Sequence, residues 1–326
     1  MGTPKKTTIQ NLIKGTVIKN TGSSYLVRTV DGEEFNCRVK GNFRIKGIRT
    51  TNPVAVGDIV KIVHAADDAY YIVEIEPRKN YIIRRASNLS KESHILAANI
   101  DQALLVASIF NPETPLTFID RFLATSEAYS VPAIIIFNKS DLWTPEITEY
   151  AENLKSLYEE IGYKVVFTST ISGDGIQELK ELTHNKISLL AGNSGVGKSS
   201  IINALVPDVE LRTGEVSDLH HTGTHTTTFS EMISLPDGGE LIDIPGVKGF
   251  GMIEFDEAEV DHYFPEIFKM SEGCKYGDCR HLGEPGCAVE KAVEEGKIAP
   301  SRFSSYLSIM EEVNGSQKDD KYRKPF

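Results

Sequence analysis

Apolar and β-branched residues form short runs through the first quarter of the chain, and Gly, Asn and Asp separate these runs. No helical period connects them, so the pattern predicts several short strands of an all-β domain. Strands of this length and spacing favour a small barrel. The predicted strands cover residues 15–19, 24–30, 34–39, 58–63 and 70–75.

From about residue 86 the apolar runs alternate with segments of helical period, which is typical of a parallel sheet covered by helices on both faces. The clearest helix begins after Thr144, a capping residue that precedes Pro145, and ends at Gly162. This helix lies between two apolar runs and therefore defines one βαβ unit. The runs cover residues 102–109, 133–137, 165–168, 187–191 and 240–244.

After Gly251 the strand-like runs give way to helical segments, one of which has apolar residues at positions 303, 307, 310 and 313. The pattern therefore predicts three domains: a β-barrel over 1–85, an α/β domain over 86–252 and a small helical domain over 253–326. A chain of 326 residues has the length expected of two or three domains.

Composition places the chain among globular proteins, with 40% apolar and 25% charged residues. It contains neither an apolar stretch long enough for a membrane span nor a signal-peptide pattern, so we expect a cytoplasmic protein without a membrane partner. The net charge of −11 argues against a general nucleic-acid binder. However, residues 1–85 hold fifteen Lys or Arg against eight Asp or Glu, a balance of +7, which leaves −18 for the remainder. The basic stretch 38–49, which includes Phe43, can contact a phosphate backbone or can be an ordinary solvated loop.

A glycine-rich stretch with the pattern G-x4-G-K-[ST] follows the apolar run 187–191 and precedes a helical segment over 199–205. This is the pattern and the context of a phosphate-binding loop. Its backbone N–H groups can surround phosphate oxygens, Lys198 can neutralise the β- and γ-phosphates, and Ser199 can supply an oxygen to Mg²⁺. The candidate residues are Gly192, Asn193, Ser194, Gly195, Val196, Gly197, Lys198, Ser199 and Ser200.

Recognition of the base is predicted from a second motif, formed by Asn138, Lys139, Ser140 and Asp141, which directly follows the apolar run 133–137. An Asp at this place can accept hydrogen bonds from both the N1–H and the exocyclic amine of guanine. Adenine lacks this pair of donors, and an unpaired buried carboxylate would be unfavourable by several kcal/mol. The phosphate loop alone leaves ATPases and kinases open, and this motif favours GTP over ATP.

Two further segments complete the expected nucleotide site. Ser169 and Thr170 follow the run 165–168 and can present a backbone N–H to the guanine carbonyl. Asp243 can hold Mg²⁺ through water, and Gly246 can meet the γ-phosphate.

The Thr-rich stretch 222–228 lies between the phosphate loop and Asp243, where a GTPase keeps its first switch. A threonine hydroxyl of this switch completes the Mg²⁺ shell, and we expect the ligand to be Thr226, Thr227 or Thr228. An ordinary solvated loop is the alternative interpretation.

The order of these segments differs from that of a usual GTPase, which starts with its phosphate loop. Here the guanine motif comes first, followed by the second base segment, the phosphate loop, the Thr-rich stretch and Asp243. Because contacts and not chain order hold a core together, the same sheet can form from a circularly permuted chain. The chain passes from Gly246 directly into the Cys-rich segment, so the state of the γ-phosphate can be transmitted to the third domain.

Three of the four cysteines lie within fourteen residues of one another, which in an intracellular protein indicates a metal site and not disulfides. Cys274, Cys279, His281 and Cys287 offer three thiolates and one imidazole, a complete tetrahedral set for one structural zinc ion. The spacing is not the common C-x2-C pair, so free cysteines are the alternative. The remaining Cys37 is expected to be a packed strand residue.

With these motifs identified, the chain resembles the RsgA (YjeQ/YloQ) family of small-ribosomal-subunit biogenesis GTPases over nearly its whole length. The resemblance implies an OB-fold barrel, a circularly permuted GTPase domain and a zinc domain that act in late maturation of the 30S subunit, with GTP hydrolysis stimulated by the ribosome. It assigns the zinc ligands to the Cys-Cys-His-Cys cluster. Thr170 stands where Ala is frequent in the family, which matters little because the backbone makes that contact. The matching segments are NKSD at 138–141, GNSGVGKSS at 192–200, HTTT at 225–228, DIPG at 243–246 and the cluster itself.

The sequence leaves the catalytic residue open. Many GTPases orient the attacking water with a Gln just after the DxxG glycine, but Val247 stands at that position. We therefore expect slow hydrolysis by the isolated protein, and we hypothesise that His225, as in the family, orients the water once the ribosome orders the switch. A solvated loop histidine is the alternative.

The expected partners are the 30S subunit and its rRNA, and the expected oligomeric state is a monomer. A rival function is that of a GTP-sensing, RNA-binding assembly factor with negligible hydrolysis. That protein would keep the guanine site but show no phosphate release stimulated by the ribosome.

Overall fold

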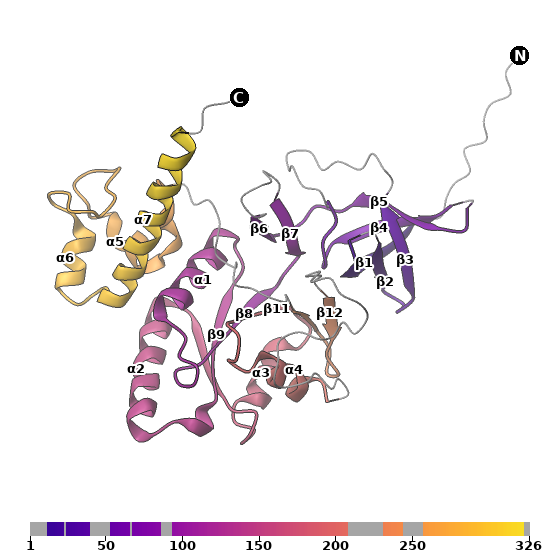
Figure 1. The fold of residues 1–326 in the computed structure, drawn as a ribbon, viewed down its shortest axis with the longest axis horizontal. Coiled ribbons are helices and arrows are strands. Elements are labelled where there is room, and N and C mark those ends of the chain that lie inside the picture. Colours follow the sequence, from indigo (N-terminus) through magenta and orange to yellow (C-terminus); the bar gives the residue numbers. More distant parts are fainter. Residues whose placement is uncertain are drawn as a thin grey trace, which may run out of the picture.

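A computed structural model describes residues 12–22, 24–39, 53–65, 67–85, 93–207, 231–243 and 257–322. Figure 1 shows three bodies in chain order: a small barrel of strands, a sheet covered by helices, and a group of helices near the C-terminus. This order follows the sequence pattern.

Five N-terminal strands form a closed barrel. β1 pairs with both β2 and β4, and β3 pairs in parallel with β5, so the ladder β1-β2-β3-β5-β4 closes on itself. Val17, Val27, Ile62 and Ile72 fill the interior together with Cys37. The predicted barrel is confirmed, and Cys37 is the packed strand residue that the sequence predicts. The strands are β1 (Ile13–Asn20), β2 (Tyr25–Thr29), β3 (Glu34–Val39), β4 (Ile59–His64) and β5 (Tyr70–Ile75).

Six strands form the sheet of the middle domain, in the order β10-β9-β8-β11-β13-β12. Neighbouring strands run parallel except β12, which pairs antiparallel with β13. All five predicted apolar runs are strands of this sheet. β11, which leads into the phosphate loop, lies between β8 and β13. The strands are β8 (Gln102–Ala107), β9 (Ala133–Asn138), β10 (Lys164–Thr168), β11 (Ile187–Ala191), β12 (Glu231–Ser234) and β13 (Glu240–Asp243).

Helices cover both faces of this sheet, as the alternation of patterns predicts (Figure 1). Successive residues of a strand point to opposite faces. Leu105 and Leu189 therefore lie in the core under α1 and α2, whereas Leu104 and Leu190 lie in the core under α3 and α4. The helices are α1 (Leu116–Ala128), α2 (Pro145–Ile161), α3 (Ile176–Thr183) and α4 (Lys198–Leu205).

Helix α2 has the two ends that the sequence predicts. The Thr144 hydroxyl accepts a hydrogen bond of 3.4 Å from the backbone N–H of Ile147, and Pro145 occupies the first turn. Gly162 has a φ of +116°, a left-handed conformation that ends a helix readily. The predicted βαβ unit is confirmed.

The barrel joins the sheet domain edge to edge. β12, at the end of the six-stranded sheet, pairs antiparallel with β1 through Lys19 and Glu231, whose side chains also form an ion pair of 2.9 Å. Ile18 of β1 and Met232 of β12 belong to the core of the sheet domain. The barrel strand thus covers what would otherwise be an open sheet edge.

The sequence pattern missed a hairpin that connects the two domains. Its strands, β6 (Tyr81–Arg85) and β7 (Ser93–Ala98), pair antiparallel. The hairpin extends across the predicted boundary at residue 85, and the three domain ranges remain predictions. Strand β12 was also missed, because four residues are too few to show a period.

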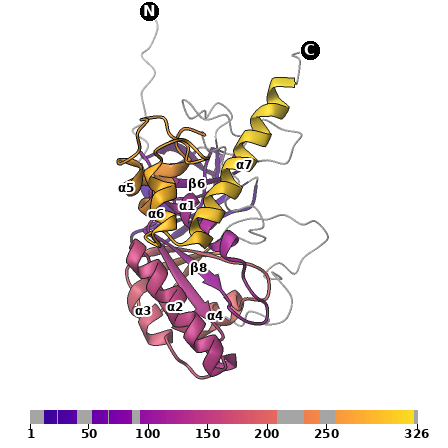
Figure 2. The same ribbon diagram turned by 90° about the vertical axis from the view of Figure 1, so that its left-hand side faces the viewer.

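The C-terminal helices pack against the sheet domain through α1 and α7, which lie side by side (Figure 1). Figure 2 shows α7 extending away from the body of the protein. Phe264, Ile267, Val289, Tyr306 and Met310 form the core of this group of helices. Among the described residues, no helix is both long and apolar enough to cross a membrane. The elements are η2 (Val260–Tyr263), α5 (Pro265–Ser271), α6 (Ala288–Glu294) and α7 (Pro300–Tyr322).

Candidate nucleotide site and metal centre

The phosphate loop follows β11 at the carboxyl edge of the sheet, and α4 begins at its lysine. Gly192 and Gly197 have positive φ, +146° and +100°. A Cβ atom on Gly192 would lie 2.2 Å from the carbonyl oxygen of Val106, and one on Gly197 would lie 2.2 Å from Nδ2 of Asn138. Glycine is therefore required at both positions, for close packing as well as for backbone conformation.

Lys198 bends back over the loop, where its Nζ donates hydrogen bonds to the carbonyl oxygens of Gly192 at 2.8 Å and Asn193 at 2.7 Å. Burial lowers the pKa of Lys198, and the carboxylate of Asp243 offsets part of this shift. Burial likewise raises the pKa of Asp243, and Lys198 offsets part of that shift. Burial disfavours both charges, and a phosphate near Lys198 and Mg²⁺ near Asp243 would supply the opposite charge to each.

Asn138 connects the guanine motif to the phosphate loop. This buried side chain donates from Nδ2 to the carbonyl oxygen of Val196 at 2.9 Å and accepts at Oδ1 from the Thr168 hydroxyl at 3.0 Å. Val196 is itself fully buried. Two motifs that lie 58 positions apart in the chain are therefore held at one place.

Asp141 lies at the surface in η1 (Ser140–Leu142) and accepts a hydrogen bond of 2.5 Å from the hydroxyl of Ser169. Ser169 is buried, and its oxygen also accepts from the backbone N–H groups of Ile171 and Ser172, each at 3.1 Å. Ser169 thus orients a carboxylate that a base can reach. Thr170 follows directly and is half-buried.

The loop 108–114, which joins β8 to α1, contacts both motifs and was not predicted. Lys139 Nζ donates a hydrogen bond of 2.6 Å to the carbonyl oxygen of Asn111, and a Cβ on Gly195 would lie 3.5 Å from the ring of Pro112. The sequence did offer one indication of this role. The loop follows the carboxyl end of a predicted parallel strand, and ligands of parallel sheets bind at that edge.

Some predicted site residues lie at the same edge of the sheet without contacts that fix a role, and others lie outside the described residues. Asn193, Ser194, Ser199 and Ser200 belong to the first group and are exposed or half-buried. His225, Thr226, Thr227, Thr228 and Gly246 belong to the second.

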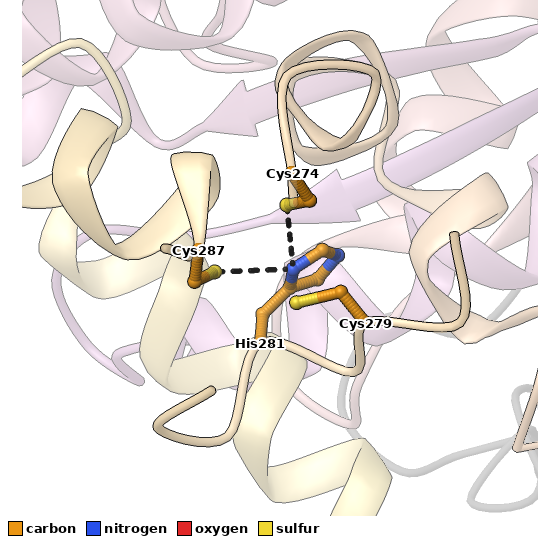
Figure 3. A group of neighbouring side chains, drawn as sticks. All are labelled: Cys274, Cys279, His281 and Cys287. Carbon is orange, nitrogen blue, oxygen red and sulfur yellow. Dashed lines mark hydrogen bonds between the residues drawn. The ribbon is translucent and has the colours of Figure 1, made fainter. Parts of the chain in front are cut away.

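The predicted metal ligands converge after α5. Cys274, Cys279, His281 and Cys287 each offer one ligand atom, and these four atoms all lie within 4.8 Å of one another. Figure 3 shows the Nδ1 atom of His281 directed toward the sulfurs of Cys274 and Cys287, at 3.7 Å and 3.3 Å. Three thiols and one imidazole match the tetrahedral preference of zinc, so these residues fit a structural zinc ion.

The surroundings of this Cys-His cluster also suit a metal. The backbone N–H of Ala288 donates to Cys274 Sγ at 3.3 Å, and the N–H of Glu290 donates to Cys287 Sγ at 3.4 Å. Burial raises the pKa of the Cys287 thiol, so its thiolate needs a nearby cation. Nε2 of His281 is buried without a hydrogen bond, and the carboxylate of Asp261 lies 3.9 Å away, too far for one but near enough to attract a polarised N–H.

Two family models match successive parts of the chain. The model of the RsgA N-terminal domain matches residues 14–72, and that of the RsgA GTPase matches residues 75–253. The chain belongs to the RsgA GTPase family. Members with similar sequences include the small ribosomal subunit biogenesis GTPase RsgA of Porphyromonas gingivalis, 58% identical over 94% of this chain and 99% of the relative. The RsgA of Bacteroides fragilis is 55% identical over 95% of this chain and 99% of the relative.

Two solved structures of RsgA-type GTPases have the same fold. YjeQ from Thermotoga maritima is 32% identical with a TM-score of 0.76, and the match covers 93% of this chain and 99% of that one. YloQ, described as a circularly permuted GTPase, is 29% identical with a TM-score of 0.71, over 96% of this chain and 97% of that one. The predicted resemblance, the permuted motif order and the classification as a GTPase are confirmed.

Proposed function

We propose that this protein binds the 30S ribosomal subunit and hydrolyses GTP to GDP and phosphate during late maturation of that subunit, with turnover stimulated by the ribosome. The proposal depends on one observation above all: Asn138 joins the guanine motif to the phosphate loop in a member of the RsgA GTPase family. The names of the relatives supply the ribosomal partner.

One guanine nucleotide would be held from both ends. Asp141, oriented by Ser169, accepts hydrogen bonds from the guanine edge, and the backbone at Thr170 donates to the guanine carbonyl. The loop around Gly195 and Lys198 surrounds the β- and γ-phosphates with N–H groups and one ammonium.

Bound Mg²⁺, which the family implies, would supply positive charge against the charge that develops on the phosphates during transfer. Ser199, Asp243 through water, and one threonine among Thr226, Thr227 and Thr228 would hold it. Gly246 would meet the γ-phosphate with its backbone N–H. The half-buried place of Ser199 at the start of α4 and the burial of Asp243 beside Lys198 support these roles.

Hydrolysis needs a residue that orients the attacking water. Val247 cannot do so, since its side chain has no hydrogen-bonding group. His225 is the candidate, because an imidazole can accept a proton from water or orient it. We expect His225 to act in this way only when the small subunit is bound.

The barrel would supply most of the contact with rRNA. Several basic side chains of its described strands already pair with acids, as in Lys14–Glu76, Lys61–Glu74 and Arg28–Glu34. Six of the fifteen basic residues before residue 86 lie outside the described residues, and these are the better candidates for phosphate contacts. They are Lys5, Lys6, Lys40, Arg44, Lys46 and Arg49.

The Cys-His cluster would hold one zinc ion that stabilises the loops between α5 and α6, since four protein ligands leave no open position for catalysis. A cytoplasmic monomer is the form in which we propose that the protein acts.

GTP hydrolysis with and without purified small subunits tests this function. We expect at least a tenfold stimulation, which corresponds to about 1.4 kcal/mol of transition-state free energy. His225→Ala should lose most of the stimulation but keep GDP affinity. His184→Ala is the matched control, because His184 lies at the amino end of β11, where it contacts the carbonyl oxygen of Asp237 at 2.5 Å.

The lack of a water-orienting residue at Val247 favours one alternative, a GTP-sensing assembly factor with negligible turnover. The assay of GTP hydrolysis with and without small subunits distinguishes this sensor from a stimulated GTPase. GTP-dependent binding to subunits without stimulated phosphate release would support the sensor and exclude the GTPase cycle.

A further inference from the structure

A buried ionic network joins the sheet domain to the C-terminal helices. Arg302 of α7 donates from Nη1 to Asp120 of α1 at 2.8 Å and from Nε to Glu266 of α5 at 2.6 Å. The side chains of Arg302 and Asp120 are 0% and 1% exposed. A buried charge is tolerated only when its hydrogen bonds are satisfied, so the relative position of these three helices is strongly constrained.

Further contacts complete this Asp120–Arg302 network. Asp120 also accepts hydrogen bonds from the hydroxyls of Tyr158 in α2, at 2.9 Å, and Ser305 in α7, at 2.6 Å. The guanidinium of Arg302 lies 4.7 Å from the centre of the Phe264 ring. Asp120 is therefore the residue at which two helices of the sheet domain and one helix of the C-terminal domain meet.

The same helix α1 begins at the nucleotide site. It follows the loop 108–114. In this loop the carbonyl oxygen of Asn111 accepts a hydrogen bond from the Lys139 ammonium, and the Pro112 ring lies against Gly195. Asp120 is eight residues after Pro112 and is the fifth residue of α1. The loop that contacts both nucleotide-binding motifs thus leads directly into the helix that contacts the C-terminal domain near its middle.

We propose that Asp120 is a positioning residue that couples the nucleotide site to the C-terminal domain through α1. A nucleotide that takes hydrogen bonds from Lys139 or moves the loop at Gly195 acts on the loop 108–114, and α1 transmits this to Arg302 and Ser305. This route is separate from the chain connection through residues 244–256.

The coupling must be reciprocal. If binding of GDP stabilises the packing of α7, then tighter packing of α7 raises GDP affinity by the same factor. This inference depends on the proposed nucleotide site but not on the ribosomal partner.

Amide hydrogen exchange of the full-length, zinc-loaded protein with and without GDP and Mg²⁺ tests the coupling. We expect GDP to slow exchange in the peptide covering residues 300–313 by about fivefold or more, within the usual range of coupling between sites. In Asp120→Asn, which keeps the shape of the side chain but removes the charge, this slowing should disappear. In the same variant, GDP should still slow exchange in α3. If Asp120→Asn instead lowered the stability of the whole protein, the effect of GDP on α3 would be lost as well.

Glu312→Gln is the matched control. Arg121 and Glu312 also pair across α1 and α7, but they are only partly buried, with side chains 24% and 39% exposed. A pair that water reaches contributes less than a fully buried one, so this variant should respond to GDP like the unchanged protein. Ser305→Ala removes one hydrogen bond to Asp120 and leaves the ion pair, so it should reduce the slowing in part and gives a second variant if Asp120→Asn does not fold.

Calorimetric titration with GDP on the same samples distinguishes failure of the coupling from failure of the nucleotide site. Absence of GDP binding would reject the proposed nucleotide site. GDP binding without slower exchange in residues 300–313, or with equal slowing in the Asp120 and Ser305 variants, would reject the coupling alone.

Discussion

The side-chain amide of Asn138 donates a hydrogen bond of 2.9 Å to the backbone carbonyl of Val196, and both residues are buried. The first residue belongs to the guanine motif and the second to the phosphate loop, so the bond holds these two segments together. In this chain the guanine motif precedes the phosphate loop, yet the fold places both at the carboxyl edge of one parallel sheet. The reversed chain order therefore does not separate the two motifs in space.

Asn138→Ala should weaken GDP binding and lower stability together. The change leaves the Val196 carbonyl and the Thr168 hydroxyl without their partner in a buried place, at about 1–3 kcal/mol for each unsatisfied group. We expect a loss of GDP affinity of about tenfold or more, measured by calorimetry, and a lower midpoint of thermal unfolding. Gln177→Ala on the exposed face of α3 should change neither quantity. GDP affinity unchanged in Asn138→Ala would contradict the bridging role.

Asp141→Asn should shift base preference from guanine toward xanthine. An amide offers a donor where the carboxylate offers an acceptor, which matches the second carbonyl of xanthine and mismatches the amine of guanine. The hydroxyl of Ser169 can still donate to the amide oxygen, so the loop should keep its shape. Competition of GDP, XDP and ADP against a labelled nucleotide measures the shift. A variant that prefers ADP would refute the assignment of Asp141 to the base.

The sequence predicted the parts of the site whose chemistry requires particular residue types. The sequence indicates these residues by type: glycines that allow close packing, a lysine suited to phosphate and a Cys-Cys-His-Cys set suited to zinc. The structure packs Gly192 closely against Val106 and brings the four Cys and His side chains together, while the roles of Lys198 and Cys287 in binding stay predictions. Strands with buried faces on both sides were also predictable, because short uninterrupted apolar runs between helical segments are typical of the inner strands of a parallel sheet.

Contacts between distant segments were not predictable from a single chain. Asn111 contacts Lys139 through a backbone carbonyl, which any residue could supply. Asp120 and Arg302 are 182 positions apart, and each is of a residue type that is ordinarily found on the surface of a helix. Strand β12 was missed because it is four residues long and is stabilised by pairing with β13 and β1.

Asp243→Asn should stabilise the protein in the absence of nucleotide while abolishing Mg²⁺-dependent GTP hydrolysis. Burial raises the pKa of Asp243 even though Lys198 attracts its charge. A raised acid pKa contributes stability below the unfolded pKa and loses it as the pH rises through the folded pKa, so at neutral pH the charged form is unfavourable. The variant should therefore have a higher midpoint of thermal unfolding than the unchanged protein at neutral pH.

Thermal unfolding of Asp243→Asn and the unchanged protein, without nucleotide and between pH 4 and pH 8, tests the predicted gain in stability. The advantage of Asp243→Asn should shrink toward the acidic end, where Asp243 is protonated in the unchanged protein. Asp237→Asn in the exposed turn between β12 and β13 serves as the control and should show no gain. A lower midpoint for Asp243→Asn at pH 8 would show that the charge of Asp243 stabilises the folded protein, which contradicts the prediction.

Cys279→Ser should release the zinc and lower the stability of the C-terminal helices, because loss of one thiolate opens a closed tetrahedral site. Metal analysis of the purified protein should give one zinc ion per chain for the unchanged protein and much less for the variant. Cys37→Ala removes the cysteine buried in the barrel and should keep the full zinc content. Equal zinc content in Cys279→Ser would remove this residue from the ligand set.

A crystal structure with GDP and Mg²⁺ would show where the two ends of one nucleotide lie, on which the proposed function depends. We predict the guanine edge at the carboxylate of Asp141 and the β-phosphate beside the ammonium of Lys198, with Asn138 still bonded to Val196. Guanine bound away from Asp141, or phosphate bound away from Lys198, would contradict the proposed site.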